Sequence, residues 1–434
     1  MRPRIHPEKR AGQLSTAAWR VRSRLGTAVA GIGSTHLVVL LCCGLFAYLV
    51  YFYLVVLVGM GWRTDISFHA RAVRLLIVDH AWPGHFLFFA TVAAFAGFNP
   101  DLDHLLRVAC IVLCLAIVLK FIVTRGVVLR LLSFDQAGRT DSDRQRQTPL
   151  VANVATLVVF SLLFAFTVPP LREWLFRFGL LGPGQWTVYL GTMPPNVWHN
   201  STFIFLMPFA VWLFWSSYRF LETGDARYLR TTVLLIVLSL LAKPSFFLAF
   251  SVAFPAMALA RFGFTRKLAE AVGAVLVGGV VLAAQYIAIY IFPTGIEAPG
   301  GIGVSFLDVW RHYSSNIPMS LLLSFAFPLA FALSYYRDVK HKLLLHYSLA
   351  CLAAALLVAV CLTEVGTRAY SCNFFWQVFA CNYLLFMVCL VEFLRISFQG
   401  AARGAKWHLT AAVYGLHVVG GLMYLQKFIT IGYQ

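Results

Sequence analysis

The sequence predicts an all-α polytopic membrane protein with about eleven transmembrane helices and an interfacial helix in the first outer loop. Two features of its composition support this fold class. Hydrophobic residues make up 60% of the 434 residues, charged residues make up only 12%, and the mean hydropathy is +0.78. Apolar runs of about 20 residues, the length that spans a bilayer as a helix, recur along the chain. These runs are apolar on every face, which excludes the alternating pattern of a membrane β-barrel.

The chain divides into a basic tail and one transmembrane helical domain. Residues 1–33 contain seven Lys and Arg and precede an apolar run without a small-residue cleavage site. We therefore expect a cytoplasmic tail followed by a signal-anchor helix, with residues 34–434 forming the membrane domain. The predicted spans are 34–60, 104–124, 149–168, 203–217, 229–241, 246–259, 268–291, 318–336, 343–363, 377–394 and 409–424.

Two stretches leave alternatives open. Lys243-Pro244 interrupts the apolar stretch 229–259, and because proline disrupts a helix interior we expect two short helices there. One broken span is the alternative. The stretch 85–98 is short for a crossing, so we expect an interfacial or re-entrant helix. Counted as a crossing, it would place the arginine-rich segment 125–147 outside.

The charge distribution predicts the orientation. A formal net charge of +18 would indicate nucleic acid in a soluble protein, but here most Lys and Arg lie in the tail and in loops between alternate spans. This bias holds loops in the cytoplasm, so we expect no nucleic-acid partner, a cytoplasmic N-terminus and an extracytoplasmic C-terminus. The predicted outer loops are 61–103, 169–202, 292–317 and 364–376. Their lengths and the tail favour a bacterial inner membrane.

The cysteines predict neither a metal site nor a disulfide framework. Six of the nine lie inside apolar runs, where thiols pack as small hydrophobes. Cys361, Cys372 and Cys381 lie near one predicted outer face, which leaves room for one disulfide. No C-x-x-C spacing occurs, and the sequence supports neither a cofactor nor a divalent metal.

The first outer loop contains the sharpest candidates for catalysis. Asp65 and His69 are four residues apart and would share one helix face. Asp65 could act as a general base, with His69 orienting substrate or assisting. The alternative is a helix-capping Asp beside a solvated His. Pro83-Gly84-His85 predicts a turn into the interfacial helix, with His85 as a cap, a headgroup contact or a catalytic group.

A second polar cluster directly precedes a predicted span. Its amide, imidazole and indole groups are suited to sugar hydroxyls and a pyranose face, and they belong to Asn196, Trp198, His199 and Asn200. The alternative is an interfacial aromatic anchor with a helix N-cap at Asn200 or Ser201. Asn373 and Trp376 form a similar pair in the last outer loop.

Three cations are candidates for binding a lipid phosphate. A lysine at membrane depth, such as Lys243, usually faces a polar cavity or an anion, or extends to the interface. Arg311 and Arg368 could bind phosphate through charge-assisted hydrogen bonds. Glu364 and Arg368 have i, i+4 spacing, so a local salt bridge is the alternative for that pair.

These residues resemble a known family. Asp65 in the first outer loop, the Pro83–His85 turn and Lys243-Pro244-Ser245 between short spans are similar to the C-fold integral membrane glycosyltransferases, the class of the lipid A aminoarabinose transferases and protein mannosyltransferases. The resemblance implies sugar transfer from a polyprenyl-phosphate donor at the outer membrane face, with Asp65 as base or as the group that orients the acceptor. This chain departs from the common form because Ile66 replaces a second acid and no large soluble C-terminal domain follows, which favours a small or lipid-linked acceptor.

The expected function is therefore that of a membrane glycosyltransferase of cell-envelope polysaccharide biosynthesis. Its expected partners are membrane lipid, a polyprenyl-phosphate sugar donor and a glycan or lipid acceptor. One alternative is a polysaccharide polymerase or O-antigen ligase, which typically has a large outer loop rich in arginine and histidine. Another is a flippase or transporter of lipid-linked sugars, although the sequence lacks the internal repeat typical of transporters.

Overall fold

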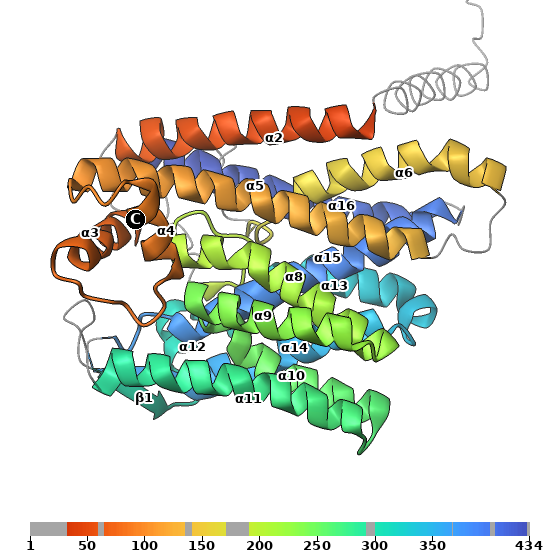
Figure 1. Cartoon of the computed structure of the whole chain (residues 1–434). Helices are drawn as coiled ribbons and strands as arrows, with labels where there is room; N and C mark the ends of the chain where they lie inside the picture. Colours follow the sequence, from red (N-terminus) through yellow and green to blue (C-terminus); the bar gives the residue numbers. More distant parts are fainter. Residues whose placement is uncertain are drawn as a thin grey trace, which may run out of the picture.

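The computed structural model describes residues 33–59, 65–134, 141–170, 191–291, 300–366, 368–399 and 404–431. Residues 1–32 of the predicted tail lie outside this part, as do portions of all four predicted outer loops. The described chain forms a bundle of roughly parallel and antiparallel helices (Figure 1). Within it, nine helices are long and apolar enough to cross a membrane, so the chain is a helical polytopic membrane protein.

The nine long apolar helices account for most of the predicted spans. They are α2 (Ser34–Val50) continued by η1 (Tyr51–Val58), α5 (Leu102–Phe134), α8 (Ser201–Thr223), α10 (Ser245–Phe262), α11 (Arg266–Tyr286) continued by η3 (Ile287–Ile291), α13 (Ile317–Val339), α14 (Leu343–Cys361), α15 (Trp376–Phe398) and α16 (Ala405–Ile431). Of the eleven spans expected, nine meet the length and hydropathy of a crossing within the described residues.

The two remaining predicted spans correspond to shorter apolar helices. α6 (Asp141–Leu162) is apolar only over Pro149–Leu162, and α9 (Ala226–Ala242) has 17 residues. Both run along the bundle beside the longer helices (Figure 1). Crossing by these two helices stays a prediction.

The first outer loop is largely helical. α3 (Asp65–Val78) packs against α4 (Leu87–Phe95), and both lie at one end of the bundle (Figure 1). α4 occupies the stretch expected to be interfacial. Its nine residues rise about 14 Å, which is too short to cross the hydrocarbon core.

The same end of the bundle also contains short strands and helices that the hydropathy pattern did not predict. β1 (Gly300–Val304) pairs antiparallel with β2 (Leu362–Gly366), and Ile302 lies opposite Glu364. The predicted span 343–363 accordingly ends earlier, at Cys361. Two short helices, α12 (Asp308–Tyr313) and η4 (Asn373–Phe375), flank these strands in the sequence.

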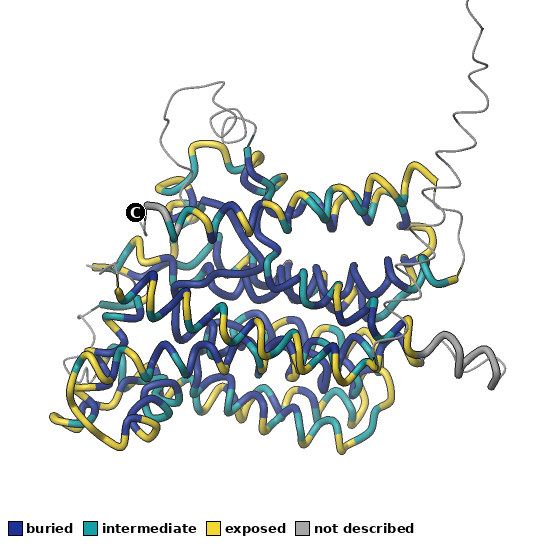
Figure 2. The backbone as a smooth tube through the Cα atoms, turned by 90° about the horizontal axis from the view of Figure 1, so that it is seen from above, coloured by how far each residue is buried: buried dark blue, intermediate teal, exposed yellow. Residues whose placement is uncertain are grey.

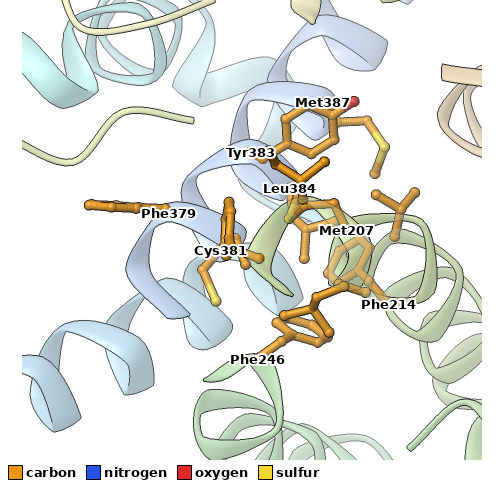
Figure 3. Packing of buried hydrophobic residues seen from close by; sticks show 14 of the residues in the cluster. Met207, Phe214, Phe246, Phe379, Cys381, Tyr383, Leu384 and Met387 are labelled. Carbon is orange, nitrogen blue, oxygen red and sulfur yellow. The ribbon is translucent and has the colours of Figure 1, made fainter. Parts of the chain in front are cut away.

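The core is centred on α15. In its apolar window 94% of the residues are buried, whereas the corresponding windows of the outer helices α2 and α11 are only 22% buried. Figure 2 shows the buried chain in the middle of the bundle and exposed positions on its outer helices. In Figure 3, Tyr383, Leu384 and Met387 of α15 pack near Met207 of α8 and Phe246 of α10. The exposed apolar faces of outer helices are those expected to contact lipid.

All nine cysteines lie within the described residues and are free thiols. The disulfide considered for Cys361, Cys372 and Cys381 is therefore not formed. Cys381 is buried within α15, where it packs as a small hydrophobe (Figure 3). The position of these cysteines near one predicted face of the membrane does not suffice for a disulfide, because the two Cβ atoms must also approach each other closely.

An irregular segment, 191–200, passes through the interior and every one of its residues is buried. Side chains from distant helices satisfy its backbone. The Tyr53 hydroxyl donates to the Trp198 carbonyl at 2.9 Å, and Asn382 Nδ2 donates to the Met193 carbonyl at 2.6 Å. Buried non-helical backbone is stable where the protein supplies such hydrogen-bond partners. This segment leads directly into α8.

Candidate functional site

The predicted polar clusters gather at one end of the bundle. The start of α8, the junction between α9 and α10, the end of α11 and the start of α15 all lie at the end that carries α3 and α4 (Figure 1). This arrangement follows from up-and-down connectivity, because alternate helix junctions meet at the same end of a bundle. Residues far apart in the sequence are thereby brought together.

A cavity of about 620 Å³ opens at this end. One wall is polar and contains five of the residues predicted from the sequence: His85, Lys243, Glu364, Arg368 and Asn373. The rest of the lining is mainly apolar and comes largely from α10, α11, η3 and β1. The cavity therefore combines two cations with a hydrocarbon-like surface, as binding an amphipathic anion requires.

Glu364 organises the polar wall from strand β2. Its Oε1 accepts a hydrogen bond from the Tyr290 hydroxyl at 2.8 Å and pairs with the Arg368 guanidinium at 3.0 Å. Its Oε2 accepts hydrogen bonds from Asn373 Nδ2, at 2.6 Å, and from the Ser371 hydroxyl. A buried carboxylate is stable only with such partners. The predicted local salt bridge thus exists, and it holds Arg368 at the cavity wall.

The sequence around Lys243 explains how this cation enters the site. Proline has no backbone N–H and favours extended backbone in the residue before it. Lys243 accordingly has φ −170° and ψ 130°, α9 ends at Ala242 and α10 begins at Ser245. The side chain is 8% exposed. Its Nζ donates to Thr202 Oγ1 at 3.1 Å and lies 5.3 Å from the centroid of a Trp376 ring.

A chain of hydrogen bonds connects Lys243 to Asp65. Thr202 Oγ1 accepts from Lys243 and donates to Asn200 Oδ1 at 3.2 Å, and Asn200 Nδ2 donates to Asp65 Oδ2 at 2.8 Å. Asn200 is also the N-cap of α8, because its Oδ1 accepts the Phe203 N–H at 3.0 Å. Asn200 can therefore cap the helix and also belong to a polar site, as the two interpretations of the sequence proposed. Asp65 is the first residue of α3, and it is not among the described residues that line the cavity.

Two neutral histidines flank Phe89 beside these groups. The ring centroids of His69 and His85 lie 5.6 Å and 5.9 Å from that of Phe89. Each Nδ1 is buried and finds no hydrogen-bond partner among the residues that the structure describes. Burial and the nearby Lys243 lower the pKa of His69 well below its usual value and that of His85 to about 3, with Arg368 also lowering the latter. Only His85 of the two borders the cavity.

Gly84 allows the His85 turn to reach the cavity. A Cβ at this position would lie 2.4 Å from Cγ1 and 2.6 Å from Cδ1 of Ile289. Any side chain would therefore separate the turn from the end of α11 and η3. The Pro-Gly-His pattern predicted a turn, but this close approach depends on the distant Ile289.

Asn196 and Trp198 are placed in the interior and away from the cavity. Asn196 Nδ2 donates to the Leu162 and Ala165 carbonyls at 2.8 Å each, and its Oδ1 accepts from Lys120 Nζ at 2.6 Å. Trp198 packs between aromatic rings of the core and is 4% exposed. In this structure both side chains stabilise the buried segment 191–200.

Three predicted residues remain, of which His199 and Trp376 are buried and Arg311 is exposed. His199 Nδ1 lies 3.0 Å from the Tyr424 hydroxyl, and burial lowers the pKa of His199 to about 4, with Asp65 opposing the shift. Trp376 is buried beneath Lys243. Arg311 is exposed on α12 and does not line the cavity.

Sequence reasoning missed Tyr290, Ser371 and Lys120. The first two bind Glu364, but they belong to an apolar span and a loop whose proximity depends on the fold. Lys120 had a detectable signal, because a lysine inside a span is costly and needs partners. It lies over the Tyr383 ring, with Nζ 3.7 Å from the centroid.

In the described part of the chain, no group of three or more His, Cys, Asp or Glu residues is arranged to hold a metal ion. No protein-family model matches this chain, and a search of curated proteins found no match. The resemblance to C-fold glycosyltransferases therefore stays a prediction. The structure shows a helical polytopic membrane protein.

Proposed function

We propose that this protein is an integral membrane glycosyltransferase that moves a sugar from a polyprenyl-phosphate donor to a lipid-linked or glycan acceptor. The observation that carries the proposal is the 620 Å³ cavity, which Lys243 and Arg368 line together with mainly apolar residues of α10, α11 and η3. A lipid phosphate has the same division between an anionic group and a hydrocarbon chain. Charge-assisted hydrogen bonds from the two cations would bind its phosphate.

The proposed active site faces the extracytoplasmic side. Basic residues concentrate at the opposite end of the bundle, as at Arg219 near the end of α8, Arg261 near the end of α10 and Lys267 at the start of α11. Positively charged loops are retained in the cytoplasm. With α6 and α9 counted as short crossings, the eleven-span topology places the N-terminus in the cytoplasm and the cavity outside.

The proposed reaction displaces phosphate from the anomeric carbon. The acceptor hydroxyl oxygen forms the new bond to that carbon, while the bond to the phosphate oxygen breaks and its electron pair leaves with the phosphate. Lys243 and Arg368 stabilise the charge that develops on the departing group. The hydroxyl proton passes to a general base.

Asp65 is the proposed base, and Asn200 orients its carboxylate through the 2.8 Å hydrogen bond. The other acid of the site, Glu364, already accepts hydrogen bonds on both oxygens and pairs with Arg368, so its role is to position the polar wall. The neutral His85 and the Asn373 amide at the cavity are the proposed contacts for sugar hydroxyls. His69 supports this wall through its contact with Phe89.

The Asp65→Asn variant tests the proposal. Purified protein is incubated with a polyprenyl-phosphate sugar and an acceptor lipid, and released polyprenyl phosphate is measured. Because the amide cannot accept the proton, we expect transfer to fall by about 100-fold or more, within the range for loss of general base catalysis. Asp79→Asn is the matched control, because Asp79 is an exposed acid at the same end of the bundle.

Full activity of the Asp65→Asn variant would remove Asp65 from the role of base. If the native protein releases no polyprenyl phosphate from any donor but moves labelled lipid across vesicles, the glycosyltransferase proposal is wrong and a transport function replaces it. Formation of long glycan chains would instead identify a polymerase or ligase.

A further inference from the structure

The apolar wall of the cavity continues as a groove along α11. Five residues of this helix line the cavity. Four of them, Gly279, Leu282, Ala283 and Tyr286, follow the i, i+3, i+4, i+7 spacing of one helix face, and the fifth is Gln285. Leu248 of α10 lines the same cavity. From Tyr286 to Gly279 the helix rises about 10 Å, so the groove extends away from the polar end towards the middle of the bundle.

Two adjacent glycines on α11 have opposite surroundings. A Cβ on Gly278 would lie 2.3 Å from the Phe247 ring and 2.6 Å from Ile236, so this residue packs α11 closely against α9 and α10. A Cβ on Gly279 would have no heavy atom within 4 Å. Gly279 also lines the cavity. Its missing side chain therefore leaves the far part of the groove open.

The charge at the near end of the groove indicates the occupant. Lys243 and Arg368 line the same cavity as Gly279, while the groove between them and Gly279 is lined mainly by apolar side chains. An anionic head with a linear hydrocarbon chain matches both parts. Because bilayer hydrocarbon is itself apolar, such a groove selects a chain by its shape.

We propose that this groove binds the first isoprene units of a polyprenyl phosphate and that Gly279 determines how far the chain extends along α11. The inference rests on the proposed function for the identity of the lipid, and it adds the specificity-determining residue. Each isoprene unit carries a methyl branch, so a polyprenyl chain is bulkier than an acyl chain along its whole length, and the open space at Gly279 accommodates this bulk. An ordinary anionic phospholipid is the competing occupant.

Direct binding measurements test the groove. The protein is reconstituted in nanodiscs, and the affinities of a long-chain polyprenyl monophosphate and of dimethylallyl phosphate, a single isoprene unit, are measured. We expect Gly279→Phe to weaken long-chain binding by about tenfold, a typical effect of blocking part of a ligand site. Binding of dimethylallyl phosphate should stay within about twofold, because its chain ends before Gly279.

Gly273→Phe is the matched control. Gly273 lies on the same helix, a Cβ there would also meet no heavy atom within 4 Å, and it does not line the cavity. Gly279→Ala serves as a mild variant that keeps most of the space. If Gly279→Phe fails to fold, Gly279→Leu replaces it. We expect this variant to weaken long-chain binding by less than about tenfold and to leave binding of dimethylallyl phosphate unchanged.

Three results would contradict the proposed groove. The first is an equal loss of long-chain affinity in Gly279→Phe and Gly273→Phe, and the second is an equal loss of affinity for the long and the short ligand in Gly279→Phe. The third is competition by phosphatidylglycerol as strong as that by the polyprenyl phosphate. The binding measurements do not depend on sugar transfer, so they distinguish a failure of the groove from a failure of the proposed function. Absence of sugar transfer together with selective loss of long-chain binding in Gly279→Phe would refute the glycosyltransferase and support the groove.

Discussion

Arg368 and Arg311 lie at the same end of the molecule but in different surroundings. Both were candidates for a lipid-phosphate contact on sequence grounds. Arg368 borders the cavity and is held by the buried Glu364, at 3.0 Å, whereas Arg311 is exposed on the short helix α12. An arginine that is already ordered loses less side-chain entropy when it binds an anion. Arg368 is therefore the stronger candidate.

Replacing each arginine tests this distinction. We expect Arg368→Gln to weaken binding of a polyprenyl monophosphate by about 10-fold to 100-fold, the equivalent of one hydrogen bond to a charged group. Arg311→Gln should change the affinity by less than about twofold, as for an exposed charge. Both constants are measured in nanodiscs at equal salt. A larger loss in Arg311→Gln would place the phosphate outside the cavity.

Asn196 and Trp198 show that residue type alone does not determine where a side chain lies in the fold. Asn196 and Trp198 have side chains suited to sugar binding, and they precede a span as interface residues do. The structure instead uses Asn196 to satisfy the Leu162 and Ala165 carbonyls and uses Trp198 as core packing. A buried irregular segment needs such partners for its polar groups. No local pattern predicts that segment 191–200 runs through the interior.

At the scale of elements, proline and glycine determine where the helices that form the site end and pack. Pro244 separates α9 from α10 and places Lys243 at the junction, and this break was predicted from the sequence. The β1–β2 pair was not predicted, because its strands are separated by more than one helix in the sequence. Strand β2 nevertheless provides Glu364, on which the polar wall depends.

Gly278 and Gly279 provide a test of helix packing within α11. We expect Gly278→Ala to destabilise the protein by about 1–3 kcal/mol, because the new methyl group overlaps the Phe247 ring. Gly279→Ala should instead stabilise the protein by up to about 1 kcal/mol, because alanine has the higher helix propensity and its methyl group meets no atom within 4 Å. Thermal unfolding in detergent compares the two variants. Equal destabilisation by both would show that α11 packs differently.

At the scale of the whole molecule, charge separates the two ends of the bundle. Helix junctions at one end carry Arg and Lys, while those at the other end form the cavity and its polar wall. Positively charged loops remain in the cytoplasm during insertion. The orientation proposed for the active site depends on this difference.

Cysteine labelling tests the orientation. Asp79→Cys, at an exposed position of the cavity end, should react with a membrane-impermeant maleimide in intact cells. Arg266→Cys, at the opposite end where the side chain is 91% exposed, should react only after the membrane is permeabilised. The unsubstituted chain measures background from its nine free cysteines. The reverse pattern would place the cavity in the cytoplasm and contradict the proposed topology.

The amino-acid sequence alone predicts a helical membrane protein, because long apolar segments must satisfy their backbone hydrogen bonds internally. It also predicted the break at Lys243-Pro244 and the gathering of polar clusters at one end. The packing of the helices, which local sequence patterns do not reveal, brings His85, Lys243 and Arg368 to one cavity and places Asn196 in the interior. The physical reason is that hydropathy and local geometry act within a segment, whereas a site depends on which faces of distant helices pack together.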